Sequence, residues 1–88
     1  MEERIIPVSQ AEVEQALEEF VQGNVLAKGV HIEPESLLRD IGVDSYSVIE
    51  MVLFIERRFG VVLPEDQLVP ENLKSVRALA ACTVKMMA

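Results

Sequence analysis

Apolar residues recur at helical spacing in the first part of the chain. Between Ala11 and about Val25 they fall three or four positions apart, with glutamates on the opposite side. Ser9 precedes this segment and Glu12 follows three residues later, as in a capping box, while Pro7 keeps the helix from starting earlier. This pattern predicts a first helix, which buries Val13, Ala16, Leu17, Phe20 and Val21.

A second amphipathic segment runs from Ser45 to Phe59. Asp44 is a good N-cap, Gly60 ends the segment, and Arg57 and Arg58 lie in its last turn, where cations suit the helix dipole. The sequence therefore predicts a second helix, whose core stripe is Val48, Met51, Val52, Ile55 and Phe59.

A short segment rich in proline and acidic residues follows the second helix. Residues 61–63 are apolar and extended, Pro64 opens an acidic turn or short helix around residues 65–68, and Pro70 closes it. Ser75 then caps a final helix to about Met86, which buries Val76, Leu79, Ala80 and Thr83.

Glycine and proline punctuate the long connection between residues 23 and 44. We expect a loop that crosses the domain and sends Leu37, Leu38, Ile41 and Val43 into the core. No segment alternates apolar and polar residues as a half-buried β-strand does. The sequence therefore predicts an all-α fold, a small bundle of three to four helices with a long loop between the first two.

Length and charge limit the possible functions. Residues 1–88 suffice for a single domain, but not for a conventional enzyme with a walled cleft. The formal charge of -7 disfavours nucleic acids and anionic membranes as partners and favours a monomer. With neither a signal peptide nor a membrane-spanning run, we expect a cytoplasmic location.

Side chains for catalysis are scarce. His31 is the single histidine and lies in the predicted loop, while Cys82 is the single cysteine and reads as a buried apolar residue. No usual set of metal ligands can be assembled from them. Asp40 with Asp44, or Glu65 with Asp66, could bind a divalent cation weakly, but solvated charges near helix ends explain these pairs equally well. We therefore expect neither an enzyme nor a metal site.

Ser45 is the residue that a structural role explains least. If Asp44 caps the second helix, the Ser45 hydroxyl stands at the first helical position, faces water and has no structural duty. A phosphodiester there would also benefit from the positive end of the helix dipole. The Asp-Ser dipeptide alone is weak evidence, since serine near a helix start is usually a cap.

The longer motif around Ser45 resembles the acyl and peptidyl carrier proteins. That family is marked by a Gly-x-Asp-Ser stretch, which opens a helix that ends in Phe-Gly before an Ile-Pro-like step. This chain has Gly42-Val43-Asp44-Ser45 and, further on, Phe59-Gly60 and Leu63-Pro64 at matching spacing. The resemblance is strong over residues 37–79 and weaker across the first helix.

The resemblance implies a carrier with a covalent 4'-phosphopantetheine arm. It implies that a phosphopantetheinyl transferase attaches the arm to Ser45 from coenzyme A, with Asp44 helping to position metal and cofactor. The carrier does no chemistry itself. A ligase loads the thiol of the arm as an acyl or aminoacyl thioester, and downstream synthases, ligases or transferases then use that thioester.

The second helix would be the recognition helix for partner enzymes. Its predicted partner-binding residues are Tyr46, Ile49, Glu50, Leu53, Phe54 and Glu56. Phe54 has an alternative role, packing against the long loop. Tyr46, Ser47, Arg57 and Arg58 depart from fatty-acid-synthesis carriers, so the chain is more similar to discrete carriers of specialised metabolism.

Two other function classes remain open on the sequence. One is a non-catalytic helical docking module that uses the same apolar residues of the second helix without any modification. The other is a small hydrolase or ligand-binding protein, which the absence of a general base makes remote. The sequence does not identify the tethered group, because the loading enzyme selects it.

Overall fold

The computed structural model describes residues 8–87, and this part of the chain contains helices and no strand. This confirms the predicted all-α bundle. The predictions for Pro7 and the N-terminal residues before it lie outside the described residues. The elements are α1 (Gln10–Asn24), η1 (Leu38–Ile41), α2 (Ser45–Phe59), η2 (Glu65–Gln67), α3 (Pro70–Leu73) and α4 (Val76–Met87).

Side-chain and glycine caps fix the helix ends at the predicted positions. The Ser9 hydroxyl accepts the Glu12 N–H, and the Glu12 carboxylate accepts the Ser9 N–H, which completes the capping box. At α4 the hydroxyl of Ser75 accepts the N–H of Ala78. Gly60 ends α2 in the left-handed conformation at φ 66°, which glycine adopts without steric cost.

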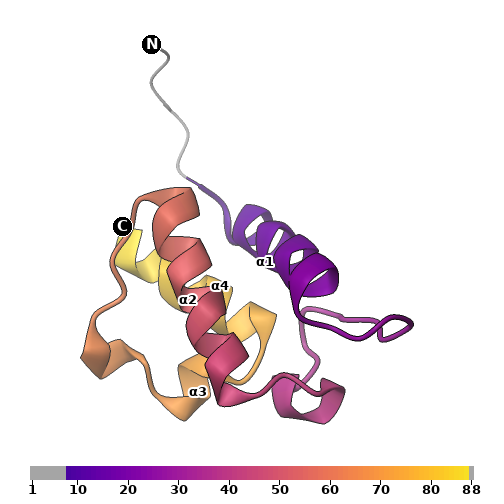
Figure 1. The fold of residues 1–88 in the computed structure, drawn as a ribbon. Helices are drawn as coiled ribbons and strands as arrows, with labels where there is room; N and C mark the ends of the chain where they lie inside the picture. The colour runs from indigo at the N-terminus through magenta and orange to yellow at the C-terminus, as the bar shows by residue number, and fades with distance from the viewer. Residues whose placement is uncertain (1–7, 88) are drawn as a thin grey trace.

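The core lies where α1, α2 and α4 meet. α1 packs on both α4 and α2, and Figure 1 shows α2 rising from the η1 end of the molecule towards the start of α1. Of the residues predicted for the core stripes, Phe20, Val48 and Phe59 are only partly buried. The fully buried side chains include Val13, Leu17, Val21, Met51, Ile55, Val76, Leu79 and Thr83.

The long loop contributes to the core differently from the prediction. Leu38 and Val43 are buried and Ile41 is partly buried, as predicted, but Leu37 is 37% exposed and its predicted burial is wrong. Ile32, which the sequence did not single out, is buried instead. The reason is the 3-10 turn η1, which directs Leu38 inward and leaves the residue before it at the surface.

Pro70 begins an element and does not close one. The acidic turn η2 ends at Gln67, and Pro70 is the first residue of the four-residue helix α3. Proline is well suited to a first helical position, because the N–H that it lacks would have no partner there. The sequence therefore indicated the break in the chain correctly, but not the short helix that follows.

Contacts from α4 hold the long loop in place. The backbone N–H of Arg77 donates to the Pro34 carbonyl at 2.9 Å, and its guanidinium forms ion pairs with Glu35 of the loop and Glu14 of α1. Further along, the Leu38 N–H donates to the Lys74 carbonyl at 2.9 Å. These contacts fix η1 beside α3 and thereby position the chain that leads into α2.

Candidate functional site

The turn before α2 delivers Ser45 to the surface. Gly42 takes a left-handed conformation at φ 88°, which reverses the chain after η1. Val43 is buried, and its N–H donates to the Leu38 carbonyl at 3.0 Å. The next two residues, Asp44 and Ser45, are both exposed. A buried residue thus anchors the turn directly before the candidate serine.

Asp44 is the N-cap of α2, so Ser45 is not needed for this role. Its Oδ1 accepts the Ser47 N–H at 2.8 Å, and this bond, followed by one to the Ser47 side chain, lowers the pKa of the Asp44 carboxyl. Ser45 is the first residue of α2, and its hydroxyl forms no hydrogen bond within the described residues. The hydroxyl is therefore free and accessible, as the sequence predicted.

Two apolar grooves meet at Ser45. The groove on the side of η1, which we call the η1 groove, has a volume of about 410 Å³ and is lined by Ser45, Leu37, Arg39, Glu71, Leu73 and Lys74, among others. The groove on the side of η2, the η2 groove, has a volume of about 650 Å³, and its lining includes Ser45, Ile49, Leu53, Glu56, Glu65 and Leu68. A group attached at Ser45 therefore has two surfaces within reach.

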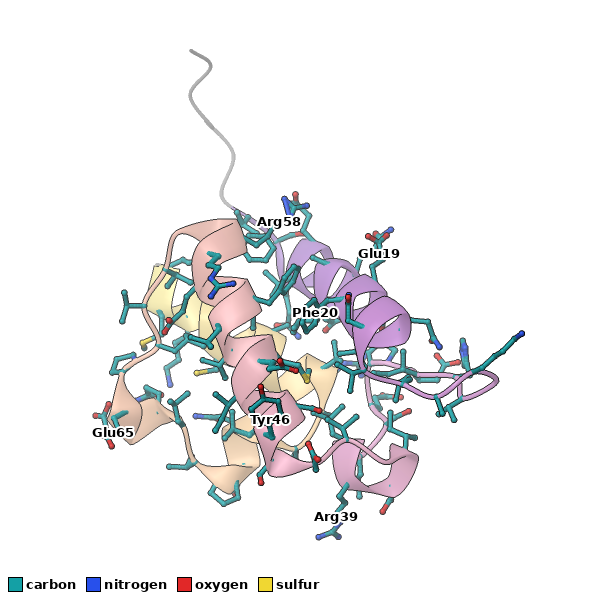
Figure 2. All side chains as sticks on the ribbon, viewed as in Figure 1. Glu19, Phe20, Arg39, Tyr46, Arg58 and Glu65 are labelled. Atoms are coloured by element: carbon teal, nitrogen blue, oxygen red, sulfur yellow. The ribbon has the colours of Figure 1, made fainter. Side chains whose placement is uncertain are left out.

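One face of α2 is apolar and exposed. Tyr46 is 68% exposed, Ile49 57% and Leu53 43%, and their spacing places them on one side of the helix. Figure 2 shows Tyr46 in front of the α2 ribbon, pointing away from the bundle. Arg57, one turn beyond Leu53, is exposed and has no ion pair within the described residues. Tyr46, Ile49 and Leu53 therefore offer an apolar contact surface next to Ser45.

Phe54 and Glu56, two of the six predicted partner residues, also have internal contacts. Phe54 is half-buried, and its ring stacks on Phe20 of α1 with centroids 4.6 Å apart, so it packs against α1 rather than the long loop. A Glu56 Oε2 accepts the Leu63 N–H at 3.0 Å. Glu50 is partly exposed beside this ring pair. A role for these three side chains in partner binding stays a prediction.

The remaining reactive side chains are separate from Ser45. His31 is exposed in the long loop, where its Nε2 lies 2.8 Å from a Glu33 carboxylate oxygen. Cys82 is buried, and burial raises the pKa of its thiol. Within residues 8–87, no three histidine, cysteine or acidic side chains come together as metal ligands, and no helix is long and apolar enough to cross a membrane.

A family model identifies the class of protein. Residues 15–83 match the model described as "Phosphopantetheine attachment site", so the chain belongs to this family of carrier proteins. The cofactor of the family is covalently attached 4'-phosphopantetheine, and its members are carriers without catalytic activity of their own. This confirms the family, the cofactor and the non-enzymatic role that the sequence motif implied.

Known relatives include carriers of two kinds. Aminoacyl carrier protein 2 of Bradyrhizobium diazoefficiens is 41% identical over 59 residues, 67% of this chain and 64% of that protein. An acyl carrier protein of Acidothermus cellulolyticus is 44% identical over 46 residues, 51% of this chain and 52% of that protein. The chain therefore matches less than two thirds of the length of either relative.

A solved structure has the same fold. The crystal structure of Bradyrhizobium japonicum glycine:carrier protein ligase complexed with glycylated carrier protein contains a similar chain, with a TM-score of 0.67 and 25% identity. The match covers 83% of this chain and 96% of that chain. The small bundle described above is therefore a carrier-protein fold.

The residues around Ser45 fit a phosphopantetheine group. A phosphodiester linkage requires an exposed hydroxyl that forms no other bond, and Ser45 supplies one. The N-terminus of α2 also favours the negative charge of the phosphate. The grooves offer apolar surface for the arm. Sequence reasoning did not find the cationic residues Arg39 and Lys74 beside Ser45, because only the contact of η1 with α3 brings them together.

Proposed function

We propose that Ser45 carries the 4'-phosphopantetheine arm and that the chain tethers acyl, aminoacyl or related intermediates as thioesters on it. The arm ends in a thiol that can be loaded, and the tether raises the local concentration of the intermediate at each enzyme that the carrier meets. In this role the protein moves a substrate between biosynthetic enzymes, and residues 1–88 act as one carrier domain.

The observation that most directly supports Ser45 as the attachment site is that Asp44, and not Ser45, caps α2. Because the Asp44 carboxylate takes the Ser47 N–H, the Ser45 hydroxyl is not needed to cap α2. An exposed aspartate is ionised at neutral pH, and the bond to Ser47 lowers the pKa of Asp44 further, so this carboxylate is in the state required to attract a metal ion. Asp44 would thus help to place metal and coenzyme A when the transferase modifies the neighbouring serine.

The loading partner we propose is an ATP-dependent ligase that activates an amino acid or another carboxylic acid. The similarity to an aminoacyl carrier protein, and to a carrier crystallised with a glycine ligase, supports this class of partner. The other partners are a phosphopantetheinyl transferase and the downstream enzymes of a specialised pathway. We place the protein in the cytoplasm, where coenzyme A and ATP are available.

The partner face we propose is the exposed side of α2 next to Ser45. Tyr46, Ile49 and Leu53 supply its apolar contacts. Of the acidic residues, Glu50 is the better placed to meet a basic partner, since one oxygen of Glu56 already holds the Leu63 N–H. The chain meets its partners with an apolar stripe and few free carboxylates.

Mass spectrometry of the intact protein tests the attachment site. The purified chain is incubated with coenzyme A, magnesium and a promiscuous phosphopantetheinyl transferase, beside Ser45→Ala and Ser47→Ala. We expect one added phosphopantetheine on the wild type and on Ser47→Ala, and none on Ser45→Ala. If Ser45→Ala is modified, or if the folded wild type is not, the proposed attachment is wrong.

A second experiment separates the carrier from a docking module that needs no arm. The glycine:carrier protein ligase with ATP and glycine serves as the probe enzyme, and binding and loading are measured for the arm-bearing wild type, Ser45→Ala and Leu53→Glu. A carrier needs Ser45 for loading. A partner bound equally well by Ser45→Ala, with no thioester formed on the wild type, would favour the docking module.

A further inference from the structure

The two grooves at Ser45 differ in charge. Arg39 and Lys74 line the η1 groove together with the carboxylates of Asp44 and Glu71, so its charges sum to zero. Glu56 and Glu65 are the only charged residues that line the η2 groove, which therefore carries two negative charges and no positive one. A negatively charged group attached at Ser45 would be repelled on one side and tolerated or attracted on the other.

Both cations of the η1 groove are available. Lys74 is exposed and has no ion pair within the described residues. The Arg39 guanidinium is 3.8 Å from the Asp40 carboxylate, and both side chains are largely exposed, so this pair is weak. Figure 2 shows Arg39 and Glu65 on opposite sides of the start of α2.

The η1 groove also has an exposed apolar wall. Leu37 is 37% exposed although the residue after it is buried, and Leu73 of α3 lines this groove as well as the η2 groove. One backbone hydrogen bond joins the two sides of the groove, from the Leu38 N–H to the Lys74 carbonyl. The groove is therefore preformed, with apolar surface near Ser45 and cations at its rim.

We infer that the resting arm lies in the η1 groove, with its phosphodiester near Lys74 and Arg39 and its pantetheine chain against Leu37 and Leu73. This inference rests on the proposed attachment of the arm to Ser45. The phosphodiester carries a permanent negative charge and is bonded to Ser45, so a small electrostatic preference is enough to orient it. A resting arm on this side leaves the exposed face of α2 free for a partner.

Paramagnetic NMR on the arm-bearing protein tests the position of the arm. The ¹⁵N-labelled chain is modified with a coenzyme A analogue that carries a nitroxide at the thiol end, which leaves the buried Cys82 untouched. We expect the amide signals of Leu37, Leu38 and Glu71 to lose most of their intensity relative to the reduced, diamagnetic sample. Stronger losses at Ile49, Leu53 and Leu68, or equal losses on both sides, would overturn the inference.

A matched pair of double variants tests the role of charge. Arg39→Glu with Lys74→Glu should abolish the losses in the η1 groove, whereas Arg57→Glu with Lys85→Glu, which changes the net charge equally, should preserve them. The losses should also weaken in high salt, because exposed charges are screened. Losses that survive the first double variant would show that these cations do not hold the arm.

The attachment step distinguishes this inference from the proposed function. A wild-type chain that gains no arm contradicts both proposals. A chain that gains the arm at Ser45 but places it elsewhere, or lets it move freely, contradicts only the resting position and leaves the carrier function intact.

Discussion

Replacing Phe54 with alanine tests whether this residue serves the fold or a partner. Its ring stacks on Phe20 with centroids 4.6 Å apart and an interplanar angle of 18°, which joins α1 to α2. A fully buried phenylalanine replaced by alanine costs about 3–5 kcal/mol. Because both rings are only partly buried, we expect each single substitution to lower the free energy of unfolding by about 2 kcal/mol.

The stacking itself should appear as a coupling between the two substitutions. Aromatic pairs contribute about 0.5–1.5 kcal/mol beyond the area they bury. The double variant Phe20→Ala with Phe54→Ala should therefore be less destabilised than the sum of the single variants by about that amount. In a domain of this size, each kcal/mol lowers the melting temperature by about 4–8 °C, so the single variants should melt about 10 °C below the wild type.

Urea unfolding followed by circular dichroism measures the four proteins of this cycle. Leu53→Ala is the matched control, since Leu53 is a neighbour of Phe54 on α2 but is 43% exposed, and we expect a change of no more than about 0.5 kcal/mol. If Phe54→Ala destabilises no more than this control, or if the two phenylalanine substitutions simply add, the reasoning that Phe54 holds α1 against α2 is refuted.

Three further substitutions have expected effects on stability. Glu18→Gln should stabilise the protein at pH 7 by about 0.2–0.5 kcal/mol, because burial and then neighbouring carboxylates raise the pKa of Glu18 in the folded state. Thermal melts at several pH values should show this gain in stability vanish at a pH below the ordinary glutamate pKa. A gain that persists at such a pH would contradict the prediction. Glu56→Ala should lower the free energy of unfolding, measured in urea, by about 1–3 kcal/mol, because it leaves the buried Leu63 N–H unpaired. Glu56→Gln keeps an acceptor for this N–H and should lose less stability. Equal losses for the two variants would argue against the hydrogen bond. Gly42→Ala should lower the free energy of unfolding by about 1–2 kcal/mol in the same measurement, because Gly42 has a φ of 88° that alanine adopts only with strain. Gly23→Ala, within α1, should be neutral or stabilising. If Gly23→Ala is the more destabilising of the two, the argument from backbone conformation is wrong.

Local signals in the sequence account for the helices and for the family. A capping box at Ser9, an aspartate cap at Asp44 and a glycine stop at Gly60 act within one turn of chain, so they can be recognised without a structure. The motif that contains Ser45 is likewise contiguous, which is why the sequence could predict an exposed serine at the start of α2 and the class of cofactor.

Contacts between distant segments decided what the sequence could not. Ile32 is buried on a loop whose path α4 fixes through Arg77, more than 40 positions further along the chain, and Leu37 is exposed because η1 turns Leu38 inward. The stacking of Phe54 on a residue of α1 depends in the same way on how two helices pack.

The two grooves at Ser45 are the clearest case. Arg39 and Lys74 are far apart in the sequence, and nothing local indicates that both flank the candidate serine. They do so because η1 and α3 are joined through the Leu38 N–H, a contact that exists only in the folded chain. The sequence by itself determined where the proposed attachment site lies, since a cap and a motif are local. Only the tertiary structure decided which surfaces an arm at that site can reach.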